Sequence, residues 1–557
     1  MTASTFRLAI VLALVAASLA ACGERTLKET ATNVALQQQL SAPPDYAEGD
    51  RELWNAVRVA YRHNGGALLW LDDRRPREQA LLLRSAIADA SIDGLDPLQY
   101  DVRALDGLEQ VDDGLFSPDR YLPAAAADAD ARLTYAAAAF VRDLHRGRVA
   151  PSDAGKNFVG ARRELSIGKL VHAAANSRDV ATTLRRAAPL HPQYAKWRDA
   201  HAQLRARAAQ GGWPQVPASA VAKSGTRNPD LAPLRERLAA SGHYVAAMPA
   251  DPAAGQAHDA AALRDALTRF QREHGLEADG IPGKATIAAL NVPIEDRIRQ
   301  IEINLERMRW LAHDLGETHI LVNLPTFHLE AIEDGRKALE MRVVAGKRHT
   351  PTPVFSDTIE TVVFSPFWHV PRNILKGEVL PKLARDPSYL SRENMELVRD
   401  GARVDPWSVD LGDPSLRVRQ RPGAGNALGQ VKFLFPNPHD VYLHDTPADA
   451  LFARAARSFS HGCVRVEQPY ELAQWLLRSQ PEWPPQKIGA AMQSGREQHV
   501  ALAKDVPVHL VYFTVWADDD GTMRYAEDLY GHDARHAAHV PPTWPTMPQE
   551  AGQVAQQ

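Results

Sequence analysis

The sequence predicts a multidomain α+β protein, with a helical scaffold first, a small three-helix module next and a mostly-β domain with an inserted lid last. Apolar residues repeat at helical spacing in an alanine-rich region that ends near Gly211. A compact, glycine-punctuated helical unit follows it. From His319 onward, short β-branched segments bounded by Gly, Pro or Asp predict strands. A chain of 557 residues has room for roughly three or four such domains.

The first 21 residues have the pattern of a signal peptide. Arg7 precedes an apolar run, Leu8 to Leu19, that is shorter than the roughly 20 residues needed to cross a bilayer. The run ends in Leu-Ala-Ala-Cys22, which resembles the bacterial lipobox, whose cysteine is acylated and becomes the mature N-terminus. No Asp follows Cys22, so the resemblance implies a periplasmic lipoprotein anchored in the outer membrane. Cleavage as an ordinary signal peptide, or an uncleaved anchor, remains the alternative.

Two regions follow the leader. Residues 22–50 are polar and contain a Pro-Pro pair, which predicts a tether. Residues 51–215 predict a helical scaffold, and apolar positions repeat there at Leu133, Ala137, Phe140, Val141 and Leu144. This region contains no cluster of catalytic side chains, so we expect it to have a structural role. A run rich in Pro, Ala, Ser and Gly then marks a boundary.

Residues 228–292 form the next predicted unit. Leu231, Leu234 and Leu238 begin one helix, Leu263, Leu267 and Phe270 lie on one face of a second, and residues 286–290 form a short third. The spacing of Phe270-Gln271, Asp279-Gly280, Gly283 and Thr286 resembles the small peptidoglycan-binding domain of cell-wall enzymes. The resemblance implies a possible contact with glycan. The alternative is a helical module that only packs against its neighbours.

The C-terminal part predicts a connector helix and a β-rich domain. Residues 294–313 are amphipathic, and residues 317–535 predict a sandwich or open barrel that includes a hairpin around Asp518–Gly521. A polar, proline-containing, partly helical stretch at about 373–425 interrupts the strand pattern, so we expect it to be a lid inserted in this domain. Residues 541–557 predict a disordered tail.

Cys463 is one of only two cysteines, and the leader accounts for the other. In an exported protein, a thiol without a partner in its own chain is either an inert buried side chain or a nucleophile. His444 lies in a strand-like segment and is the natural base, with Asp445 or a nearby carbonyl to hold its tautomer. His461 is the competing candidate.

The residues around the thiol favour a catalytic role. Gly462 allows a bound carbonyl to approach the backbone, so the amides of Gly462 and Cys463 could bind a developing oxyanion. Residues 469–477 predict a helix, and we expect Cys463 in the short approach to it, near exposed N–H groups.

His444, followed by Ser460-His461-Gly462-Cys463-Val464-Arg465, resembles the signature of the YkuD-type L,D-transpeptidase catalytic domain. Further stretches resemble the large YcbB-like branch of that family, which also carries a lid-like insertion: Phe367 to Pro371, Pro422 to Gly429 with Lys432-Phe433, Tyr442 to Pro447, and Asn304 to Leu311. A lipobox departs from the ordinary membrane anchor or signal that we associate with this branch.

The resemblance implies a cysteine acyltransferase acting on peptidoglycan stem peptides. Cys463 would attack the diamino acid carbonyl at position 3 of a tetrapeptide, release D-alanine, and pass the acyl group to a second stem as a 3–3 cross-link. His444 would be the base. His461 and the Gly462 and Cys463 amides would orient groups and stabilise the oxyanion. Tyr442 and Ser460 would contact substrate, and Arg465 would brace the loop or bind a substrate carboxylate.

Other functions remain open on the same residues. Water as acceptor would give an L,D-carboxypeptidase or hydrolase, a lysine would give a lipoprotein-to-wall attachment enzyme, and a vestigial site would leave a wall-binding scaffold. Zinc bound by His444, His461 and Cys463 is disfavoured because the spacing lacks a tight ligand motif such as His-Glu-x-x-His. We expect no cofactor.

The partner classes follow from charge and leader. A net charge of −4 gives no reason to expect nucleic acid. We expect stem peptides as substrates, a membrane contact through a lipid on Cys22, and cell-wall synthases as possible partners.

Overall fold

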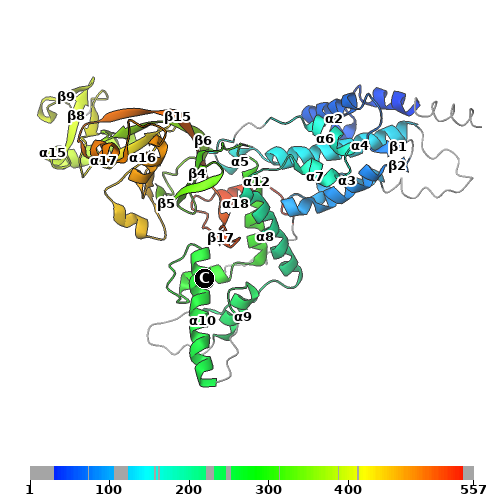
Figure 1. Cartoon of the computed structure of the whole chain (residues 1–557), viewed down its shortest axis with the longest axis horizontal. Coiled ribbons are helices and arrows are strands. Elements are labelled where there is room, and N and C mark those ends of the chain that lie inside the picture. Colours follow the sequence, from blue (N-terminus) through cyan, green and yellow to red (C-terminus); the bar gives the residue numbers. More distant parts are fainter. Residues whose placement is uncertain are drawn as a thin grey trace, which may run out of the picture.

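The computed structural model describes residues 31–72, 75–105, 123–155, 158–160, 164–220, 231–245, 252–312, 314–386, 388–410 and 413–543. Figure 1 shows three parts: the helical scaffold on the right, the β-rich domain on the left, and a helical module that projects below their junction. The predicted leader with Cys22 and most of the predicted tail lie outside the described residues. None of the helices in the described ranges is long and apolar enough to cross a membrane.

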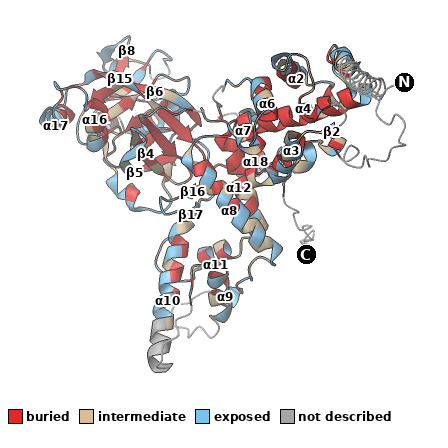
Figure 2. Cartoon of the chain, turned by 45° about the vertical axis from the view of Figure 1, so that its right-hand side comes forward, coloured by how far each residue is buried: buried red, intermediate tan, exposed pale blue. Residues whose placement is uncertain are grey.

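The scaffold is built around one long buried helix. Helix α4 (Pro123–Arg146) is alanine-rich and buries sixteen of its residues, so its neighbours approach closely, as Figure 2 shows. The scaffold also contains α2 (Arg51–His63), α3 (Glu78–Ala88), α6 (Ile167–Ala175), α7 (Val180–Arg185), α8 (Pro192–Ala209), the 3₁₀ turns η1 (Asp45–Ala47), η2 (Asp89–Asp93), η3 (Pro97–Gln99) and η4 (Arg103–Leu105), and the strand pair β1 (Leu71–Asp72) and β2 (Arg75–Pro76). Helix α5 (Pro151–Ala154) packs on the β-rich domain instead, and the 3₁₀ turn η5 (Ala218–Ala220) packs on the projecting module.

Part of the predicted tether is folded instead. Residues 31–39 are helical, and Leu36 and Leu40 are buried in the scaffold core. The polar composition of residues 22–50 concealed this pair of leucines, whose spacing of four places both on one helix face. At the other end, the Thr543 backbone N–H donates to the Glu302 carboxylate at 3.3 Å, so the start of the predicted tail is held against the connector helix.

The projecting module consists of α9 (Ala232–Ala240), α10 (Pro252–Glu273) and α11 (Lys284–Leu290) around a core of its own. Gln271 ties its turn together, because its amide donates to the Asp279 carboxylate at 2.9 Å and accepts from the Gly280 N–H at 2.8 Å. It also donates to Thr286 Oγ1 at 3.2 Å. The motif residues that marked this module in the sequence therefore brace its turn.

The connector helix α12 (Ile294–Met308) joins the scaffold to the β-rich domain. Its residues Ile301, Leu305 and Met308 share one hydrophobic core with scaffold helices and with Phe513 and Val515 of the β-rich domain. The predicted amphipathic helix is confirmed, and it ends five residues before the expected boundary at 313. The shared core makes the scaffold a support for the C-terminal domain.

The C-terminal domain is a nine-stranded sheet with strand order β13-β5-β14-β12-β11-β6-β15-β3-β4. Because β4 also pairs with β5, the sheet closes on itself. Its strands are β3 (His319–Asn323), β4 (His328–Glu333), β5 (Arg336–Gly346), β6 (Phe355–Phe364), β11 (Val431–Leu434), β12 (Leu443–His444), β13 (Ser458–Ser460), β14 (Val464–Val466) and β15 (Gln498–Val511). The predicted hairpin is β16 (Val515–Ala517) with β17 (Met523–Tyr525), and η8 (Asp449–Ala453), α16 (Pro469–Leu477), α17 (Pro485–Gln493) and α18 (His532–Ala537) complete the domain.

The predicted insertion folds as a subdomain with a small core of its own. We call this subdomain the lid. The sequence indicated a partly helical stretch, whereas the structure also contains a four-stranded sheet with order β7-β10-β8-β9. Its elements are β7 (Trp368–His369), α13 (Arg372–Ile374), the π-helix η6 (Leu375–Val379), α14 (Leu380–Arg385), α15 (Tyr389–Arg392), β8 (Met395–Arg399), β9 (Ala402–Val404), η7 (Pro406–Ser408) and β10 (Arg417–Gln420).

Candidate active site

Three adjacent strands place a histidine between two cations. Lys432 on β11 lies opposite His444 on β12, and His444 lies opposite Arg465 on the parallel strand β14. Residues directly opposite on neighbouring strands point to the same face of a sheet. On the other face, the alternating residues Val431, Phe433, Leu443, Val464 and Val466 are fully buried in the domain core. Polar and apolar residues alternate along these strands, so the polar side chains lie on one face of the sheet.

Cys463 and Tyr442 lie on this face as well. Cys463 comes two residues before Arg465, and Tyr442 comes two residues before His444, and alternate residues of a strand point to the same face. The Val464 N–H donates to the Tyr442 carbonyl at 3.2 Å, which brings the two side chains together, and the Tyr442 hydroxyl hydrogen-bonds the Cys463 thiol. The thiol also contacts the Asp440 carbonyl at 3.7 Å. We call Lys432, Tyr442, His444, Cys463 and Arg465 the reactive face.

The electrostatics of the reactive face keep its imidazole neutral. Burial, with the charges of Arg465 and Lys432 on either side, lowers the pKa of His444 to about 3. The ring places Nδ1 at 2.5 Å from the backbone carbonyl of Asp445, which fixes the Nδ1–H tautomer and leaves the lone pair on Nε2. The Asp445 carboxylate, the alternative partner in the sequence, instead accepts from the Gln430 and Thr446 N–H groups.

The thiol is protonated at neutral pH in this arrangement. Burial raises the pKa of Cys463, and the bonds from Tyr442 and the charge of Arg465 offset only part of that effect. The sequence predicted that Cys463 lies in the approach to a helix, with N–H groups that would favour the thiolate. Helix α16 does begin at Pro469, but strand β14 lies between it and the cysteine, so the helix N-terminus does not act on the sulfur.

Ser460 shapes the loop that carries the cysteine. Its hydroxyl donates to the Cys463 carbonyl at 2.5 Å and accepts from the Gly462 N–H at 3.1 Å. Ser460 is only 2% exposed, so its expected contact with substrate is replaced by these bonds. They also occupy the Gly462 N–H, one of the two expected oxyanion donors. Gly462 has φ +124°, which favours glycine at this position.

Two residues that sequence reasoning missed support the same loop, Thr352 by direct contact and Tyr530 through Gly346 and Thr352. Thr352 donates from Oγ1 to the Gly462 carbonyl at 2.8 Å and accepts from the Gly346 N–H at 3.0 Å. Tyr530 donates to the Gly346 carbonyl at 2.8 Å. Both are distant from Cys463 in sequence and carry no motif, so no local signal could have identified them.

His461 points to the lid. Its Nε2 lies 3.0 Å from the Glu378 carboxylate in η6, so this imidazole pairs with the insertion. The two histidines of the sequence motif are therefore separated: His444 lies within the reactive face and His461 joins the catalytic loop to the lid. His461 is thereby turned away from His444 and Cys463, the other two side chains considered for zinc.

The region that carries this geometry matches the family model "L,D-transpeptidase catalytic domain" over residues 317–492. The chain contains a YkuD-type L,D-transpeptidase catalytic domain. Two further models match outside this domain: "Scaffold domain" over residues 55–200 and "Putative peptidoglycan binding domain" over residues 227–290. The resemblances to the L,D-transpeptidase catalytic domain and to the peptidoglycan-binding domain are confirmed, as is the order of a helical scaffold, a small helical module and a β-rich L,D-transpeptidase domain.

A curated relative supports this assignment. The Haemophilus influenzae protein named "Putative L,D-transpeptidase" is 34% identical over 239 residues, which cover 42% of this chain and 48% of the relative. The chain thus spans about half the length of the relative that it matches. Among solved structures, an L,D-transpeptidase from Xylanimonas cellulosilytica is 16% identical, with 53% of this chain and 100% of that one covered and a TM-score of 0.18. L,D-transpeptidase 3 from Mycobacterium tuberculosis is 14% identical, with 35% and 61% covered and a TM-score of 0.18.

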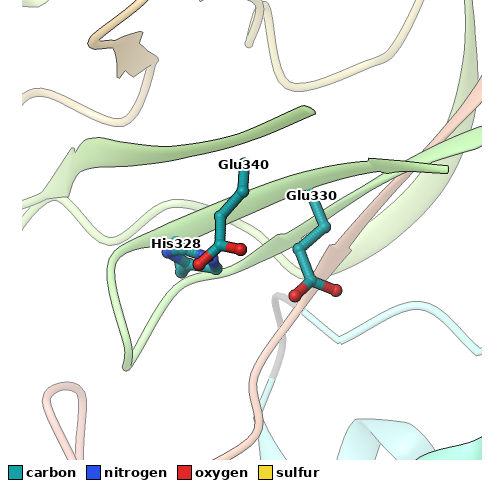
Figure 3. A group of neighbouring side chains, drawn as sticks. All are labelled: His328, Glu330 and Glu340. Atoms are coloured by element: carbon teal, nitrogen blue, oxygen red, sulfur yellow. The ribbon is translucent and has the colours of Figure 1, made fainter. Parts of the chain in front are cut away.

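A second cluster of ionisable side chains lies on β4 and β5 of the L,D-transpeptidase domain. His328, Glu330 and Glu340 gather there, as Figure 3 shows. Glu330 and Glu340 are cross-strand neighbours, and the Lys337 ammonium lies 3.7 Å and 2.5 Å from their carboxylates. The lysine offsets the repulsion between two like charges, so the cluster is a salt-bridge network that pins this hairpin.

Proposed function

We propose that this chain is a periplasmic peptidoglycan L,D-transpeptidase that forms 3–3 cross-links through a thioester on Cys463. The observation that carries the proposal is the reactive face, where a half-buried thiol bonded by Tyr442 shares one sheet face with a neutral His444. The match of this region to an L,D-transpeptidase catalytic domain supports the reaction class.

In the acylation step, the Cys463 sulfur attacks the carbonyl carbon at the L-centre of a diamino acid in the donor stem, while His444 Nε2 takes the thiol proton. The C–S bond forms and the bond to the D-alanine nitrogen breaks. His444 returns the proton to the leaving amine. Because the thiol is neutral beforehand, His444 acts as a general base during attack.

In the second step, the amine of an acceptor stem attacks the thioester. The C–S bond breaks, an amide forms, and the proton passes through His444 to the sulfur. The Cys463 N–H is the proposed oxyanion donor in both steps, since Ser460 occupies the N–H of Gly462. Tyr442 holds the sulfur in place.

The other regions fit a cell-wall location. We propose that residues 228–292 bring the enzyme to glycan, that the lipobox directs it to the outer membrane through Cys22, and that cell-wall synthases are its partners. The match of residues 227–290 to a peptidoglycan-binding model supports the first of these proposals.

The proposal is tested by expressing the chain in a bacterial strain that lacks its own L,D-transpeptidases and analysing its muropeptides by mass spectrometry. We expect 3–3 dimers with the native chain and none with Cys463→Ala. Tripeptides without dimers would indicate water as the acceptor, and an unchanged profile with both chains would reject the enzyme.

A further inference from the structure

Lys432 and Arg465 are cations without a close counter-charge. Among the residues that the structure describes, neither side chain forms an ion pair with a carboxylate, and the Nε of Arg465 is buried without a hydrogen-bond partner. Burial lowers the pKa of both side chains. Both side chains are half-buried, and removing a charge from water costs free energy unless an opposite charge compensates for it.

Two acidic groups of this region have partners of their own. Glu497 interacts with Lys432 only through its charge, and its carboxylate accepts from the Phe367 N–H at 2.8 Å. Glu378, the carboxylate that the lid brings to the catalytic loop, pairs with His461. Lys432 and Arg465 are therefore available to an anion from outside the described residues.

The charges of both cations act on the sulfur of Cys463. Lys432 and Arg465 each interact electrostatically with Cys463, and they lie on either side of His444 in one row across β11, β12 and β14. An anion bound between them would lie beside the thiol. In a donor peptide, the C-terminal carboxylate is three bonds from the carbonyl carbon that the thiol attacks, so it reaches this position when the attacked bond is the last one of the peptide.

We propose that Lys432 and Arg465 together form the binding site for the C-terminal carboxylate of the donor peptide, so that these two residues set the preference of the enzyme for a donor with a free C-terminal carboxylate. The guanidinium can receive the carboxylate through two N–H donors, and the ammonium adds a point charge. This inference rests on the proposed function, because it concerns the acylation step of that reaction.

The test compares two synthetic tetrapeptide donors that differ only at the C-terminus, a free carboxylate or a primary amide, and measures kcat/KM for release of the terminal residue. For the native enzyme we expect the free acid to be favoured by roughly 10- to 100-fold, the range of a charge-assisted hydrogen bond. In Lys432→Gln the preference falls toward 1, whereas Lys432→Arg keeps most of it. Lys487→Gln, an exposed lysine on α17, is the matched control and leaves it unchanged.

A second readout separates this role from stabilisation of the thiolate. If Lys432 served the sulfur alone, Lys432→Gln would slow both donors equally and shift iodoacetamide alkylation of Cys463 to higher pH, which would overturn the inference. An unchanged preference in Lys432→Gln would also overturn it. Release of the terminal residue from neither donor by the native enzyme would reject the proposed function, and the inference with it.

Discussion

The imidazole of His461 lies 3.0 Å from the carboxylate of Glu378, and this pair joins the loop that carries Cys463 to the lid. Both side chains are partly exposed, so the pair contributes at most about 1 kcal/mol to the free energy of unfolding. Its consequence is local, because the pair couples the position of the lid to the catalytic loop.

We expect Glu378→Gln to increase the mobility of the lid without lowering the melting temperature. Hydrogen–deuterium exchange of residues 375–385 would be faster than in the native protein, because η6 and α14 lose their contact with the loop. Glu393→Gln, a lid glutamate on the surface, is the control. Equal exchange rates in the two variants would show that the ion pair does not hold the lid.

Thr352→Val should lower acylation about tenfold. The substitution leaves the buried Gly462 carbonyl and Gly346 N–H without their partner, at a cost of about 1–3 kcal/mol. The rate of adduct formation between Cys463 and a carbapenem, followed by intact mass, measures the effect. Tyr470→Phe removes an exposed hydroxyl from α16 and should leave the rate unchanged. A native rate in Thr352→Val would contradict the positioning role.

Gly462→Ala should strongly reduce acylation while the domain stays folded. The space around a Cβ at this position is open, so the cost comes from a backbone angle of +124° and amounts to about 1–3 kcal/mol. The loop would relax toward a negative φ and move the sulfur away from His444. Circular dichroism checks that the domain stays folded, and the same carbapenem adduct assay measures the loss of acylation. A fully active variant would refute the role of the Gly462 backbone.

The pH dependence of the thiol follows from the directions of the two pKa shifts. Because burial raises the pKa of Cys463, the thiolate forms only above about pH 9, the ordinary value for the thiol. His444, with a pKa near 3, stays neutral from pH 4 upward and cannot form an ion pair with the sulfur. Iodoacetamide alkylation should therefore rise through a midpoint above pH 9 with no step near pH 6.5. A plateau below pH 7 would reveal a thiolate–imidazolium pair.

Local patterns predicted several elements well. The helix after the cysteine spans Pro469–Leu477 as expected, and the strands near His319 and Thr358 occur where β-branched residues alternate. His444 and Cys463 do lie on one sheet face, because strand alternation and the parallel pairing of β12 with β14 bring them there.

Contacts between segments that are distant in the chain could not be predicted from the sequence. The strands of the lid are short and polar, so their pairing depends on a small core that only the folded lid provides. Thr352 reaches Gly462 from 110 positions away, and Glu378 reaches His461 from another subdomain. Lys432 could have been noticed in the sequence, because it is the charged residue in an otherwise apolar strand. Its role could not be predicted, because that role depends on the strand register that places it opposite His444.

Every step of the proposed reaction depends on an acyl group carried by Cys463. The most direct measurement mixes the purified protein with a donor tetrapeptide, quenches the reaction in acid within its first turnover, and determines the intact mass and the labelled peptide. We expect a tripeptide thioester on Cys463, released D-alanine in equal amount, and neither product in Cys463→Ala. Release of D-alanine by Cys463→Ala, or a native protein that neither gains mass nor releases D-alanine, would show that Cys463 does not carry the acyl group.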